Sequence, residues 1–229
     1  MDAEKLTIPI NESDSVTGYL YAAAKKSPAG VTLILGHGAG ANQLSGFMRL
    51  FANGLAERGI DVLTFNFLYM EQGRKVPDVN AKLEACYDAV IAAAGKHKKL
   101  KGNRLAVGGK SMGGRIGSQV AGGVENSDAI TALVLIGYPL HPPGRPEKMR
   151  DAHLKDIHAP VLFVQGSRDA FGSADELKQA IKTSKLRATL YLVEGGDHSL
   201  KVPKSAGIPQ GQIYENAMDK IANWLTSQP

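Results

Sequence analysis

One serine lies at the centre of a Gly-x-Ser-x-Gly pattern, in which residues 109–113 read Gly-Lys-Ser-Met-Gly. A short apolar run precedes the pattern, and a stretch rich in small residues follows it. This order is typical of a nucleophile elbow, a tight turn from a strand into a helix that holds a serine hydroxyl clear of the sheet. Glycine is needed on both sides because a larger side chain would clash with the neighbouring backbone. The pattern therefore predicts Ser111 as a nucleophile, with a Gly-rich turn and an unreactive serine as the competing interpretation.

Two further side chains, distant in sequence, supply what such a serine requires. A serine hydroxyl is a weak nucleophile near neutral pH and needs an adjacent base. His198 lies in a Gly-rich loop after an apolar run and would accept the proton, while Asp169 would orient its imidazole. Asp169 has the alternative role of capping the following helix, for which Ser173 is better placed. Asp197 is the competing acid, but it adjoins His198 in sequence, so we favour Asp169.

Backbone amides are expected to stabilise the negative charge that develops during acyl transfer. One is the N–H of Met112, directly after the serine, and the second belongs to the loop at 36–40, which reads Gly-His-Gly-Ala-Gly. We assign the second amide to Ala39, with Gly40 as the substitute. Four residues of this loop and of a Pro-rich segment are candidates for the substrate pocket, namely His37, Gly40, Tyr138 and His141.

Two cations accompany the predicted nucleophile. Alternation along the preceding strand predicts that Lys110 points away from Ser111. Arg115 lies one turn along the following helix, where it would pair with a carboxylate. A positive field near the serine would favour anionic substrates, which we state as a hypothesis.

The elements that position these residues alternate along the chain. Apolar runs predict strands at 6–10, 16–23, 31–35, 60–67, 105–107, 130–136, 160–165 and 188–193. Helical patterns lie at 45–58, 79–97, after the elbow, and at 147–154, 174–184 and 212–225, with Asp78 as the expected cap of the second. This α/β alternation predicts a mostly parallel central sheet with helices on both faces and an N-terminal antiparallel edge hairpin.

Size and composition add further expectations. The 229 residues show no linker or repeat, so we expect a single domain over 1–229, with 137–154 as a short lid-like insert. Basic residues exceed acidic ones by 27 − 22 = 5, but no aromatic residues accompany the lysine cluster at 96–101, which argues against nucleic-acid binding. We expect no membrane insertion, a cytoplasmic location, and Cys86 as a buried thiol without a disulfide partner.

Two other Gly-rich functions fit poorly. A phosphate-binding P-loop that ended at Gly109-Lys110-Ser111 would require glycine where the chain has Arg104. Residues 36–41 fit a loose dinucleotide-binding pattern, but the next helix begins too late, and that interpretation leaves His198 unexplained.

The order Ser111, Asp169, His198 and the segments 36–40, 109–115, 137–144 and 195–199 resemble the α/β-hydrolase superfamily. They are similar to a compact group without a large cap, which includes dienelactone hydrolase and the testis-expressed-type α/β-hydrolase-like proteins. The resemblance implies a serine hydrolase, in our interpretation a carboxylesterase that forms an acyl-enzyme on Ser111 from small or medium acyl esters. It implies that the protein uses neither a metal nor an organic cofactor. It also implies that the partner is a small-molecule ester. A non-catalytic binding or scaffold protein on the same fold is the alternative. The natural substrate and the oligomeric state stay open.

Overall fold

A computed structural model describes residues 3–24, 28–123 and 129–228. Within them, strands form one sheet in the order β1-β2-β4-β3-β5-β6-β7-β8. The strands are β1 (Glu4–Pro9), β2 (Ser15–Tyr21), β3 (Val31–Gly36), β4 (Asp61–Phe65), β5 (Arg104–Lys110), β6 (Ile130–Ile136), β7 (Val161–Gly166) and β8 (Ala188–Val193). The strands β1 and β2 pair antiparallel at one edge, and β2 is also antiparallel to β4. All other pairings are parallel, so the predicted fold class and edge hairpin are confirmed.

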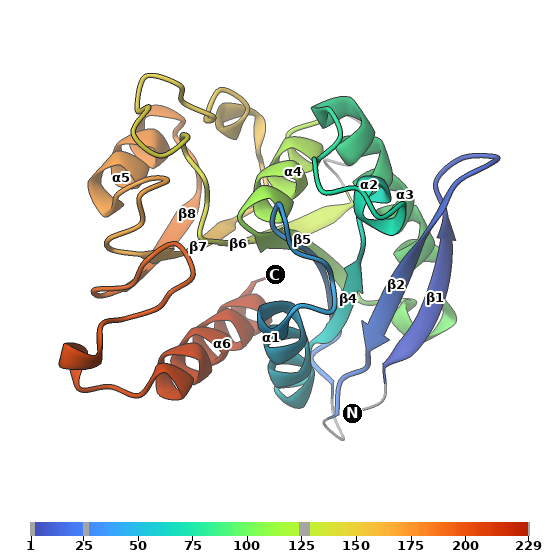
Figure 1. The fold of residues 1–229 in the computed structure, drawn as a ribbon. Helices are drawn as coiled ribbons and strands as arrows, with labels where there is room; N and C mark the ends of the chain where they lie inside the picture. The colour runs from blue at the N-terminus through green and yellow to red at the C-terminus, as the bar shows by residue number, and fades with distance from the viewer. Residues whose placement is uncertain (1–2, 25–27, 124–128, 229) are drawn as a thin grey trace.

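Helices cover the sheet on two sides (Figure 1). They are α1 (Gly46–Glu57), α2 (Leu68–Glu71), α3 (Asn80–Lys96), α4 (Met112–Ala121), α5 (Ala174–Thr183) and α6 (Gln210–Ser227), with short 3-10 helices η1 (Lys98–Leu100), η2 (Leu154–Asp156) and η3 (Lys204–Ala206). The helices α1 and α6 lie on one face of the sheet, and α3, α4 and α5 lie on the other (Figure 1).

Alternate residues of the central strands feed two separate hydrophobic layers. Ile34 packs with the side chains of α3 and α4, whereas Leu33 and Leu35 pack with those of α1 and α6. Side chains of a strand point alternately to the two faces, and a strand covered on both sides must therefore be apolar throughout. This is why the central strands read as unbroken apolar runs.

The register brings the chemically distinctive strand ends together at one edge of the sheet. Gly36 at the end of β3 pairs with Gly109 of β5, and Lys110 of β5 pairs with Ile136 at the end of β6. Gly166 at the end of β7 pairs with Val193 at the end of β8. The loops that follow these strands all begin at the carboxyl edge, where open α/β sheets bind their ligands.

Two local predictions are wrong. Residues 147–153 form turns and irregular backbone rather than a helix, and only the last residue of the predicted range begins the 3-10 helix η2. The backbone there bonds to neighbouring loops, with the N–H of Arg150 donating to the carbonyl of Leu140. Asp78 does not cap α3, whose N-cap is Val79 without a side-chain bond, because the Asp78 carboxylate instead pairs with Arg74 at 2.8 Å.

None of the helices in the described ranges combines the length and the apolar character that a membrane span requires. The single buried thiol behaves as expected, because Cys86 is fully buried in the layer beneath α3. Burial raises the pKa of the Cys86 thiol to about 12.

Candidate active site

The turn from β5 into α4 has the strained geometry that the sequence pattern predicts. Ser111 has φ 51° and ψ −118°, a backbone conformation that a residue with a side chain rarely adopts. Strain of this kind costs on the order of 1–3 kcal/mol and persists where surrounding packing enforces it. A Cβ atom at Gly109 would lie 2.3 Å from the carbonyl oxygen of Gly36, and one at Gly113 would lie 2.2 Å from the same atom. The close approach of β3 to the turn therefore requires both glycines of the elbow.

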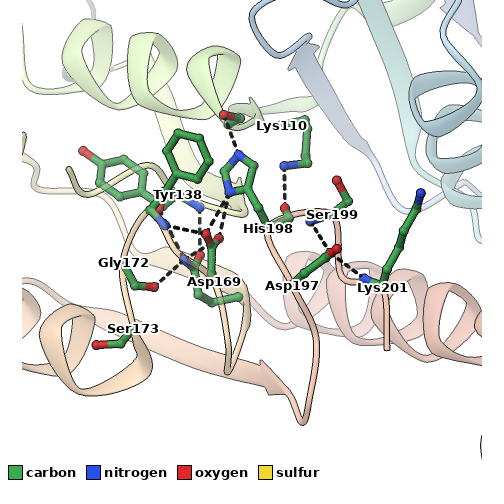
Figure 2. A network of polar contacts seen from close by, with 12 residues as sticks. Lys110, Tyr138, Asp169, Gly172, Ser173, Asp197, His198, Ser199 and Lys201 are labelled. Atoms are coloured by element: carbon green, nitrogen blue, oxygen red, sulfur yellow. Dashed lines mark hydrogen bonds and ion pairs between the residues drawn. The ribbon is translucent and has the colours of Figure 1, made fainter. Parts of the chain in front are cut away.

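The Ser111 hydroxyl and the His198 imidazole are in hydrogen-bond contact. Nε2 of His198 lies 2.9 Å from Oγ of Ser111, although 87 residues separate them in sequence. On the other side of the ring, Nδ1 lies 2.8 Å and 3.0 Å from the two carboxylate oxygens of Asp169 (Figure 2). The structure thus brings together the three side chains singled out from the sequence. This arrangement suits a relay in which the base removes the serine proton and the acid stabilises the imidazolium.

The Asp169 carboxylate is fixed by donors from its own strand and loop. Its Oδ1 accepts the N–H of Phe171 at 2.8 Å, and its Oδ2 accepts the side-chain amide of Gln165 at 2.9 Å. The carboxylate is fully buried, whereas the His198 side chain is 22% exposed. The Phe171 ring also stacks on the imidazole, with centroids 4.1 Å apart. The orientation of the imidazole is therefore set both by hydrogen bonding and by packing.

The competing acid has a different role. Asp197 Oδ1 accepts the backbone N–H groups of Ser199 and Lys201 at 2.7 and 2.9 Å, so it shapes the loop that carries the histidine (Figure 2). The alternative role of Asp169 as a helix cap is filled by Ser173, whose hydroxyl accepts the N–H of Glu176 in a capping box. Geometry thus favours Asp169 over Asp197 as the partner of the imidazole.

The loop after β3 passes beside the serine. A Cβ atom at Gly38 would lie 3.5 Å from the Cβ of Ser111, so the loop approaches the nucleophile closely. Met112 is the first residue of α4, where the N–H has no intrahelical acceptor. Ala39 is exposed and lines the cavity beside the serine. The assignment of Ala39 and Met112 to an oxyanion hole stays a prediction, and this placement is compatible with it.

The buried ring of His37 stabilises that loop through hydrogen bonds. Its ring is fully buried, and burial lowers the pKa of its imidazole to about 4. In the neutral ring Nε2 accepts the N–H of Phe67 at 3.1 Å, so Nδ1 carries the proton and donates to the carbonyl of Gly38 at 2.9 Å. His37 therefore fixes the backbone of the loop from within the core.

A cavity of about 470 Å³ opens beside Ser111 and His198. Its apolar wall comes from the start of α1 and from α6, which lie on the same face of the sheet (Figure 1). The lining residues are Gly38, Ala39, Ala41, Ser45, Gly46, Phe47, Met48, Leu50, Lys110, Ser111, His198, Ser199, Lys201 and Tyr214.

The four predicted pocket residues lie outside this lining. His37 and Tyr138 are fully buried, and the Tyr138 hydroxyl donates to the carbonyl of Arg150 inside the Pro-rich loop. His141 is buried beside Glu176, with Nε2 and Oε1 3.4 Å apart. Gly40 is exposed and is not among the lining residues. The sequence predicts α1 as a helix but does not single out its start as a wall of the cavity, although a helix that follows the loop after β3 begins near the same strand ends.

The two cations near the serine depart from expectation. Lys110 does not point away from the site, because the loop after β8 overhangs the end of β5 and the Lys110 ammonium donates to the His198 carbonyl at 2.6 Å. Burial lowers the pKa of Lys110 to about 8. The guanidinium of Arg115 contacts the amide oxygens of Gln119 and Asn80 rather than a carboxylate, and Arg115 does not line the cavity.

Comparisons with known proteins agree with this fold. A family model described as "Alpha/beta hydrolase domain" matches residues 29–226. A dienelactone hydrolase from Anabaena variabilis is 16% identical, with a TM-score of 0.73 over 99% of this chain and 96% of that one. A serine hydrolase without a lid from Xanthomonas campestris is 18% identical, with a TM-score of 0.72 over 100% and 98% of the two chains. An esterase from Pyrococcus furiosus is 16% identical, with a TM-score of 0.74 over 99% and 91%. At these identities the solved structures show a shared fold.

Proposed function

The chain belongs to the alpha/beta hydrolase family, and we propose that it is a serine hydrolase, specifically a carboxylesterase that cleaves small or medium acyl esters. The observation that carries the proposal is the continuous contact from Ser111 Oγ through the imidazole of His198 to the buried carboxylate of Asp169. Such a relay has a direct chemical use, since it raises the nucleophilicity of the serine as it attacks a carbonyl carbon.

The proposed reaction has two halves. Ser111 Oγ attacks the acyl carbonyl while Nε2 of His198 removes its proton, and the resulting oxyanion accepts hydrogen bonds from the amides of Met112 and Ala39. Collapse of this intermediate breaks the bond to the alkoxy group, which takes the proton from the imidazolium and leaves as the alcohol. A water molecule then attacks the acyl-serine by the same route, releasing the acid and restoring the hydroxyl.

The cavity supports the proposed substrate class. Its volume of about 470 Å³ lies within the range of small-molecule sites. Phe47, Met48 and Leu50 of α1 provide an apolar wall beside the nucleophile, which suits an uncharged acyl chain. The similar solved proteins include an esterase and a dienelactone hydrolase, which is in keeping with the proposed hydrolase function.

A fluorophosphonate probe tests the proposal, because it reacts covalently with activated serines. Wild-type protein should be labelled, and Ser111→Ala should not. Ser199→Ala is the matched control, since Ser199 lines the same cavity and should not be the labelled residue. A panel of p-nitrophenyl esters from acetate to laurate then gives the acyl preference. Absence of labelling in folded wild-type protein would favour the alternative, a binding or scaffold protein on this fold.

A further inference from the structure

The Lys110 side chain joins the nucleophile elbow to the backbone of the catalytic-histidine loop. Lys110 is the last residue of β5, directly before Ser111, and its ammonium donates to the carbonyl oxygen of His198 at 2.6 Å (Figure 2). The side chain is partly buried and lies near the Phe47 ring, 6.0 Å from its centroid. Its charge is thus held against the backbone of His198.

The end of β6 leaves room for this contact. Gly137 has φ +57°, a conformation that favours glycine. A Cβ atom at Gly137 would lie 2.8 Å from the Lys110 ammonium nitrogen and 2.6 Å from the His198 carbonyl oxygen. The absence of a side chain at Gly137 therefore lets the lysine, the histidine backbone and β6 meet at one point. The ends of β5 and β6 thus both leave room for the hydrogen bond from Lys110 to the His198 carbonyl.

Some contacts of the histidine loop are made within the loop, and others tie it to α6, where the Gln210 amide and the Tyr214 hydroxyl donate to the carbonyls of Leu200 and Ser199. The Asp197 carboxylate accepts N–H groups of Ser199 and Lys201, and Leu200 adopts φ +59°. These bonds set the internal shape of the loop. The bond from Lys110 instead ties the backbone of His198 to the strand that carries the nucleophile.

We propose that Lys110 is a positioning residue for His198, holding the imidazole at bonding distance from Ser111. The inference rests on the proposed hydrolase function. Burial lowers the pKa of Lys110 to about 8, so the amine is mostly protonated near neutral pH.

The test compares the rate of fluorophosphonate labelling for wild type, Lys110→Met, Lys110→Gln and Lys110→Arg. Methionine fills a similar volume without charge, and arginine keeps both the charge and the donor. We expect Lys110→Met to react about 10- to 100-fold more slowly. Lys110→Arg should recover most of the rate.

Controls separate positioning from folding and from substrate binding. Lys99→Met removes an exposed lysine that pairs with Glu4 and should behave as wild type. Circular dichroism and thermal melting check folding, and Lys110→Gln supplies a polar neutral variant in case methionine prevents folding. With the preferred p-nitrophenyl ester, kcat should fall and KM should change little.

The outcomes are distinguishable. If wild type reacts and the folded neutral variants match it in rate, the positioning role is overturned while the proposed function stands. A rise in KM alone would also overturn it, by making Lys110 a substrate contact. If wild type itself is not labelled, the proposed function fails, and the inference fails with it.

Discussion

Both carboxylate oxygens of Asp169 lie within hydrogen-bond distance of Nδ1 of His198, at 2.8 and 3.0 Å, while Nε2 of the same ring lies 2.9 Å from the Ser111 hydroxyl. Since Asp169 accepts at Nδ1, that nitrogen carries the proton and Nε2 is left with its lone pair toward the serine. The carboxylate therefore selects the tautomer that can act as a base.

Replacing this acid by its amide is expected to reverse that selection. In Asp169→Asn the amide can donate to Nδ1, which stabilises the tautomer with the proton on Nε2. We expect kcat to fall by about 10³- to 10⁴-fold with the fold intact. Steady-state hydrolysis of a p-nitrophenyl ester measures the loss. Asp175→Asn, an exposed acid on α5, is the control and should keep the wild-type rate. A loss below tenfold for Asp169→Asn would indicate that the imidazole is oriented by its packing on Phe171 alone.

The approach of α4 to β3 leads to a stability test. A Cβ atom at Gly113 would lie 2.2 Å from a backbone oxygen, which cannot move away as a flexible side chain would. We expect Gly113→Ala to lower the free energy of unfolding by about 1–3 kcal/mol or to prevent folding. Gly95→Ala is the matched control, because no atom lies within 4 Å of its added Cβ and alanine favours a helix. It should raise stability by about 0.5–1 kcal/mol. Urea denaturation of both variants compares them, and equal effects would contradict the tight packing of the elbow.

The acyl preference should depend on the start of α1. The Phe47 ring lines the cavity and stacks on Phe51 at a centroid distance of 4.2 Å. Phe47→Ala enlarges the cavity, so we expect kcat/KM for long acyl chains relative to short ones to rise about tenfold. The ester panel measures this ratio. Leu44→Ala, whose side chain is 48% exposed and outside the lining, should leave the ratio unchanged. An unchanged ratio in Phe47→Ala would place the acyl chain elsewhere.

Stability should fall in acid because of buried imidazoles. Burial lowers the pKa of His37 from 6.5 to about 4, and that of His153 in the same way. As pH falls below about 6.5, the unfolded state binds a proton that the folded state does not, so stability is present above that pH and is lost toward pH 4. His37 accounts for up to about 3 kcal/mol of this loss. Denaturant unfolding between pH 7 and 4 should show a smaller decline in His37→Gln. Variant His158→Gln, which removes an exposed ring, should retain the full decline. Equal declines in wild type and His37→Gln would refute a neutral, buried His37.

The catalytic candidates could be predicted because each follows an apolar strand. Parallel strands end at one edge of the sheet, so residues far apart in sequence, such as Asp169 and His198, were expected to meet there. The edge hairpin was predictable from a polar turn between two short apolar runs. Strand and helix types followed from these patterns, while their ends shifted by a few residues, as at the start of α6.

The cavity wall could not be predicted, because it depends on how whole helices pack. Phe47 of α1 and Tyr214 of α6 meet with centroids 5.9 Å apart, and nothing in the local sequence of either helix specifies this pairing. The predicted direction of the Lys110 side chain is wrong for a similar reason. Alternation describes the direction of a Cβ atom, but the overhanging loop of His198 extends the site to the other side of the strand. Tyr138 and His141 do not line the cavity as predicted, because the Pro-rich loop packs both side chains into the protein interior.

The most direct measurement is mass spectrometry of the protein after rapid acid quenching of its reaction with a p-nitrophenyl ester. A reaction in which Ser111 is the activated nucleophile must pass through a covalent acyl-serine. We expect the acyl group on the peptide that contains Ser111 in wild type, and neither acylation nor turnover in Ser111→Ala. Turnover by Ser111→Ala at the wild-type rate, or acyl transfer to another residue in wild type, would contradict the proposed role of this serine.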